Sequence, residues 1–130
     1  MNERTAATLR SLGAALAGFL AYGGWAFFVN QSHGQDMGLR AGLTQGSYSF
    51  LLTLTTTYLM EYLLMLFADL PGRRFVTIAV TVAITFATAY GINWIMGTPE
   101  ILLTILPGFI IGAVYTVSYV MALTTLKAST

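Results

Sequence analysis

Cysteine is absent from the 130 residues, and histidine occurs once. The absence of cysteine excludes disulfides, thiolate metal sites and cysteine nucleophiles. The sequence also has no glycine-rich phosphate loop, and only one carboxylate, Glu61, lies within a long apolar stretch. No nucleophile–base pair can be assigned from such a set. We therefore expect a protein that is not an enzyme and that has neither a cofactor nor a metal site.

Charged residues are also scarce, at 8% of the chain, whereas a soluble domain carries about 25%. Hydrophobic residues make up 56%, and the mean hydropathy is +0.73. So few charges could not cover the surface of a soluble fold, which makes the lipid bilayer the expected surroundings. The net charge of +1 provides no basic surface for nucleic acid.

Four long stretches contain no Asp, Glu, Lys or Arg: 11–35, 41–60, 75–99 and 101–126. A helix needs about 20 mostly apolar residues to cross a bilayer. We therefore predict an all-α polytopic membrane protein, with one transmembrane domain over residues 1–130. The predicted transmembrane helices lie at about 10–29, 44–68, 74–96 and 99–126.

The predicted connections differ in length. Pro71 and Gly72 break the chain between the second and third helices. Gly97 suits a left-handed helix end, Thr98 can cap the next helix, and Pro99 fits its first position. The first connection, from Asn30 to Gly42, is longer and polar.

Lysine and arginine predict the orientation, because cytoplasmic loops carry an excess of both. With the N-terminus inside, five of the six such residues are cytoplasmic and only Arg40 is outside. The cytoplasmic five are Arg4, Arg10, Arg73, Arg74 and Lys127. Both termini are therefore expected in the cytoplasm, in a plasma membrane or a bacterial inner membrane.

Glu61 is the residue most in need of explanation, because it is an ionisable residue within a predicted transmembrane helix. It lies eight residues before Asp69, which places it about 12 Å from the cytoplasmic end of that helix. A charge at that depth costs about 3 kcal/mol or more. Counting depth from the helix ends brings Thr57, Thr81 and Tyr119 near its level, as an intramembrane polar site. Three interpretations stay open. Glu61 titrates a proton or binds a cation, it is protonated and joins helices by a hydrogen bond, or it contacts another subunit.

The fourth helix contains Pro107, Gly108 and Gly112. Proline removes a backbone hydrogen bond and should kink the helix. The two glycines form a G-x-x-x-G, which lets another backbone approach closely. This face is expected to pack on another helix, either within the chain or in a partner.

Two functional hypotheses follow. The first is an accessory, structural or lipid-handling subunit of a larger membrane assembly, with another membrane protein as its partner. The alternative is a small proton-coupled transporter that works as a homo-oligomer, with Glu61 as its titrating carboxylate.

Overall fold

The computed structural model describes residues 2–129, with side chains for residues 2–126. Its elements are α1 (Glu3–Asn30), η1 (Gln31–His33), α2 (Gln35–Leu66), α3 (Arg73–Ile95) and α4 (Ile101–Ser129). The predicted all-helical class is confirmed. Four helices in the described part of the chain are long and apolar enough to cross a membrane, which fits an integral membrane protein.

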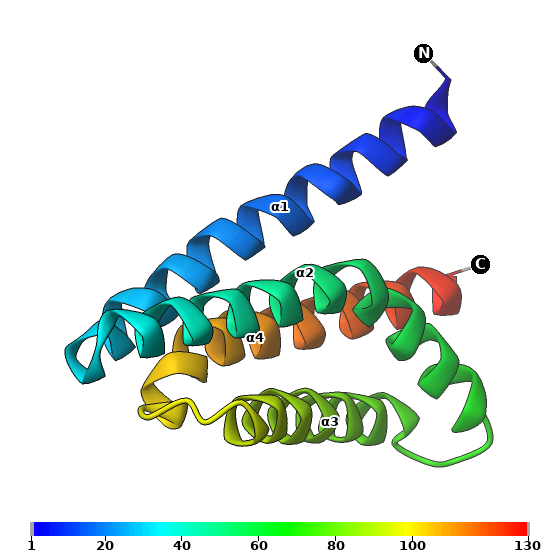
Figure 1. The fold of residues 1–130 in the computed structure, drawn as a ribbon. Coiled ribbons are helices and arrows are strands. Elements are labelled where there is room, and N and C mark those ends of the chain that lie inside the picture. The colour runs from blue at the N-terminus through cyan, green and yellow to red at the C-terminus, as the bar shows by residue number, and fades with distance from the viewer. Residues whose placement is uncertain (1, 130) are drawn as a thin grey trace.

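Helix α1 packs against the first half of α2 and then diverges from the other helices toward the N-terminus (Figure 1). The last part of α2 bends away from α1 toward α3, which packs against both α2 and α4. We call the side with η1 and the α3–α4 connection the η1 end, and the opposite side the termini end. The helices are thus tightly joined at the η1 end and open between α1 and the rest at the termini end.

Two helices begin well before their predicted starts, by seven residues for α1 and nine for α2. Helix α1 begins at Glu3 because the Asn2 side chain accepts a hydrogen bond from the Thr5 N–H at 2.7 Å and caps the first turn. Helix α2 begins at Gln35, so most of the expected polar connection is helical. The cause is packing: a Cβ on Gly38 would lie 3.1 Å from the Phe27 carbonyl oxygen. Close contact with α1 outweighs the weak helix propensity of glycine.

Glycines make the contact between α1 and α2. Gly23 meets Gly42 so closely that a Cβ on Gly23 would lie 2.9 Å from the Gly42 carbonyl oxygen. A Cβ on Gly46 would lie 3.0 Å from the Phe19 carbonyl oxygen. Gly38, Gly42 and Gly46 are spaced four residues apart and therefore lie along one face of α2. This is the small-residue packing by which membrane helices associate.

The tight connections rest on glycine. Gly72 and Gly97 have φ angles of 72° and 75°, in the left-handed region that favours glycine. Gly97 thus adopts the conformation expected of it. Thr98 has a different role from the predicted cap, because its hydroxyl donates to Asn93 Oδ1 at 2.8 Å. Helix α4 begins at Ile101, two residues after Pro99.

Pro107 lies inside α4. Its missing N–H leaves the carbonyl of Leu103 without a helical partner. The indole Nε1–H of Trp25 donates to that carbonyl at 2.9 Å. The proline therefore creates a hydrogen-bond acceptor that joins α4 to α1.

The buried apolar core is small. Met60, Leu64 and Val120 form one cluster, flanked by Ile78 and other partly buried side chains. Many large apolar side chains are exposed instead, on all four helices. A soluble protein would not expose so much apolar surface, so these side chains are suited to contact with lipid.

Candidate functional site

A cavity of about 810 Å³ lies between α1 and the facing surfaces of α2, α3 and α4. It is bounded by the part of α1 that diverges from the other helices (Figure 1). Its volume is within the range of about 300–1,000 Å³ that is usual for ligand sites. Its lining includes these hydroxyl and amide side chains: Thr8, Ser11, Tyr22, Gln45, Tyr48, Ser49, Thr53, Thr56, Thr57, Tyr58, Thr85, Tyr115 and Thr116.

The cavity reaches two nearly buried polar side chains on α2. Gln45 and Ser49 are only 3% and 7% exposed, and both line the cavity. The Gln45 carbonyl accepts a hydrogen bond from Asn93, while its amide Nε2 donates to no described residue. Among the described residues, the buried side-chain atoms without a partner are instead the hydroxyls of Thr77 and Thr81. Gln45 and Ser49 give this end of the cavity polar groups that can contact a ligand or water.

The other end of the cavity carries positive charge. Arg4 and Arg10 of α1 line it. Neither forms an ion pair within the described residues, and no Asp or Glu side chain of that part of the chain lines the cavity. Two free guanidinium groups favour an anionic ligand group at this end.

A cluster of buried polar side chains lies at the η1 end, and one of them, Gln45, also lines the cavity. We call it the amide cluster: Asn30, Gln45, Asn93, Thr98 and Thr104. Asn93 Nδ2 donates to Gln45 Oε1 at 2.8 Å, and its Oδ1 accepts from Thr98. This half of the cluster joins α2 to the end of α3 and to the α3–α4 connection.

Asn30 makes the second half of the amide cluster. Its Nδ2 donates to Thr104 Oγ1 at 2.7 Å and to the Ala26 carbonyl at 2.8 Å. Its Oδ1 accepts from the Glu100 N–H at 2.9 Å. Above this, His33 Nε2 lies 3.1 Å from the Glu100 carboxylate. The η1 end is therefore fixed by several hydrogen bonds, in contrast to the diverging termini end.

The predicted intramembrane polar site is only partly assembled. Tyr119 donates a hydrogen bond to Glu61 Oε1 at 3.1 Å, across α4 and α2. Thr57 lines the cavity, but Glu61 and Tyr119 do not. Thr81 is fully buried and its hydroxyl has no partner. Residues at one depth thus point in different directions, because depth counting does not fix rotation about the helix axis.

The predicted packing face on α4 is divided between two roles. A Cβ on Gly108 would lie 3.6 Å from the Tyr22 ring, so this glycine packs within the chain, at the edge of the cavity that it also lines. Gly112 lines the cavity, and a Cβ there would meet nothing within 4 Å. Pro107 leaves the Leu103 carbonyl free to accept the hydrogen bond from Trp25.

Thr81 provides a test of the hydrogen-bond assignment. Thr81→Val removes a buried hydroxyl that has no partner, so the free energy of unfolding should stay unchanged or rise by up to about 1 kcal/mol. Thr104→Val is the matched control, because Thr104 bonds Asn30 and the Glu100 carbonyl and its loss should cost about 1–2 kcal/mol. Unfolding in detergent measures both. A larger loss for Thr81→Val than for Thr104→Val would contradict the assignment.

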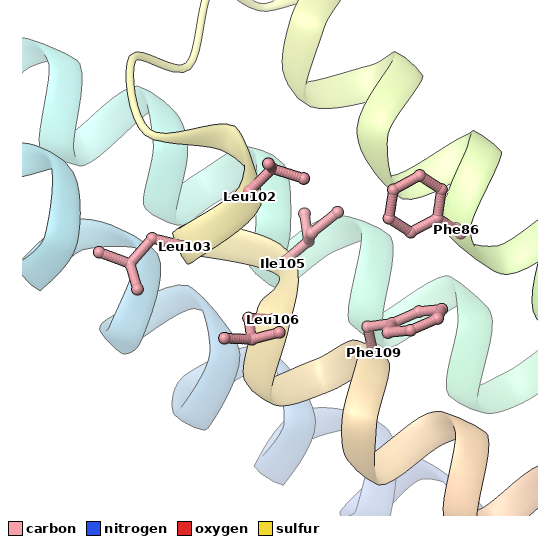
Figure 2. A pocket seen from close by; sticks show the side chains of 6 residues that line it. All are labelled: Phe86, Leu102, Leu103, Ile105, Leu106 and Phe109. Carbon is pink, nitrogen blue, oxygen red and sulfur yellow. The ribbon is translucent and has the colours of Figure 1, made fainter.

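A second, smaller pocket of about 360 Å³ lies between α3 and α4. Figure 2 shows Phe86 of α3 facing Phe109 of α4, with their ring centroids 5.4 Å apart. All of its lining side chains are apolar. This pocket can hold part of a lipid chain, but it has no group that would select a particular ligand.

Sequence reasoning missed the amide cluster and the glycines of α2. The signals were present: Asn30, Gln45 and Asn93 are amides in charge-free stretches, and three glycines recur every four residues from Gly38. The arrangement offers ligand binding, with positive charge at one end of a largely apolar cavity and hydrogen-bond donors at the other. It offers no nucleophile–base pair in that cavity. No protein-family model, curated protein or solved structure matches the chain.

Proposed function

We propose that this chain is a lipid-handling membrane subunit that holds one anionic amphiphile in the cavity between α1 and the other helices. The observation that carries the proposal is the charge distribution of that cavity. Arg4 and Arg10 supply two cations, with no acidic side chain of the described residues beside them in the lining. A ligand with one anionic head group and one long apolar chain complements such a site.

The apolar lining residues indicate what the rest of the ligand is. Apolar side chains of α1, α2 and α4 border the space between the arginines and Gln45, among them Leu12, Leu52 and Ile111. They suit a single hydrocarbon chain.

The proposed orientation is consistent with this ligand. With both termini in the cytoplasm, Arg4 and Arg10 lie at the cytoplasmic leaflet. That leaflet holds anionic lipids that attract basic segments. A lipid could then enter between α1 and α4 sideways, with its head group staying at the membrane surface.

The alternative, a proton-coupled transporter that uses Glu61, has less support. Glu61 forms a hydrogen bond with Tyr119 but does not line the cavity. A coupling carboxylate would need to contact the substrate or its path.

The lipid proposal predicts a selective stabilisation. Lysophosphatidic acid or oleate, at about 100 times the dissociation constant, should stabilise the purified protein by about 2.7 kcal/mol. Neutral monoolein, with the same chain, should have little effect. Gly112→Leu should abolish the difference, because a Cβ at this position meets nothing within 4 Å and the longer side chain would occupy space in the cavity. Thermal unfolding in a mild detergent measures each case.

Gly24→Leu is the matched control, because a Cβ at Gly24 also meets nothing within 4 Å and Gly24 does not line the cavity. This variant should keep the full response to both anionic lipids. Stabilisation by oleate but not by lysophosphatidic acid would identify a carboxylate head group, and the reverse a phosphate. Equal stabilisation by monoolein would refute the proposal.

A further inference from the structure

The end of the cavity away from the arginines is the end that a lipid chain would reach. A Cβ on Gly108 of α4 would lie 3.6 Å from the Tyr22 ring of α1. Tyr22 follows Arg10 by twelve residues, which is about 18 Å along a helix. Two apolar side chains close to Gly108 in the sequence, Ile105 and Phe109, also line the cavity. They therefore form an apolar wall at the far end from the arginines.

The polar side of this end is held in place by hydrogen bonds. Gln45 Oε1 accepts a hydrogen bond from Asn93 at 2.8 Å, and Asn93 accepts one from Thr98. Moving Gln45 aside would leave buried polar groups without partners, which is costly. A long hydrocarbon chain would therefore extend toward the apolar wall and away from the amide cluster.

The smaller pocket between α3 and α4 shares that apolar wall, because Ile105 and Phe109 line both spaces. Ile105 is 2% exposed, and its β-branched side chain has one strongly preferred rotamer in a helix. Phe109 is only partly buried. Its ring meets Phe86 edge-on, with the two ring centroids 5.4 Å apart (Figure 2). Phe109 is therefore the part of the wall that can move.

We propose that Phe109 limits the length of the lipid chain that the cavity binds. Its ring separates the cavity of about 810 Å³ from the apolar pocket of about 360 Å³. A chain that extends more than about 18 Å from Arg10 meets this ring and can enter the smaller pocket only by displacing it. The inference rests on the proposed lipid binding, and it narrows the ligand to anionic lipids whose single chain is of limited length.

Oleate and the longer nervonate test this, because both have one carboxylate and one cis double bond. Each is added to the full chain in the same detergent, and its dissociation constant is obtained from the rise in unfolding temperature with concentration. The unmodified chain should bind oleate about tenfold more tightly than nervonate. Phe109→Ala removes the ring between the two spaces and should bind both fatty acids with about equal affinity.

Phe86→Ala is the matched control. It loses the same ring–ring contact, but of the two spaces Phe86 lines only the smaller pocket. This variant should therefore keep the tenfold preference for oleate. Phe109→Leu keeps an apolar side chain of smaller size and should give an intermediate preference, which provides the test even where Phe109→Ala does not fold.

The outcomes separate the role of Phe109 from lipid binding itself. A preference for oleate that persists in full in both Phe109 variants, or that is lost equally in Phe86→Ala, would overturn the role of Phe109. Equal binding of the two fatty acids by the unmodified chain would overturn it as well, because the lipid chain would then have another way out of the cavity. No stabilisation of the unmodified chain by oleate would refute lipid binding, and this inference with it.

Discussion

Gly23→Val is expected to lower the free energy of unfolding by about 3 kcal/mol, the upper part of the range for overpacked sites. A Cβ at this position would lie 2.9 Å from the Gly42 carbonyl oxygen and 3.3 Å from Gly46 Cα. Both obstacles are backbone, which cannot rotate away as a side chain can. The variant can fold only by moving α1 away from α2, which breaks the contact that sets the cavity.

Gly24→Val provides the comparison on the same helix. A Cβ at Gly24 meets nothing within 4 Å, so the same change in chemistry should cost less than about 1 kcal/mol. Denaturation in mixed detergents, followed by circular dichroism, gives both values. Similar losses for Gly23→Val and Gly24→Val would show that α1 and α2 do not meet as described.

Asn93→Leu is expected to cost about 2 kcal/mol or more, because it leaves buried partners without hydrogen bonds. Gln45 Oε1 loses its donor and the Thr98 hydroxyl loses its acceptor. Thr98 is 6% exposed, so water cannot easily replace the lost bond. The variant should therefore unfold at a lower temperature, and the η1 end should loosen first.

Amide hydrogen exchange measures that local loosening. Protection should fall around Gln45 and at the start of α4, while the Met60–Val120 region keeps its protection. Gln31→Leu is the matched control, because Gln31 is exposed and its side chain is outside the amide cluster. A uniform loss of protection along the whole chain would contradict the separate role given to the amide cluster.

The sequence predicted the helices well because their signal is local. The lack of charge over four long stretches required four apolar helices, and Pro71 and Gly97 marked two of the ends. The start of α2 was placed nine residues too late, at 44 instead of Gln35. Glycine and polar residues there are typical of a loop, and only contact with α1 makes that segment helical.

The candidate site could be predicted less well, because it depends on how the helices rotate about their axes. Depth counting brought Glu61 and Tyr119 to one level, and the structure joins them by a hydrogen bond. The same counting could not show that Thr57 faces the cavity and that Thr81 is buried without a partner. Nor could it pair Asn93 with Gln45, which are 48 residues apart in the sequence.

The central claim is that the cavity holds an anionic single-chain lipid, and the most direct test is native mass spectrometry of the protein purified from its own membranes. We predict one bound lipid of acidic character per chain, retained by Gly24→Leu and lost from Gly112→Leu. A protein that carries no lipid, or that carries only neutral lipids to the same extent in both variants, would contradict the account.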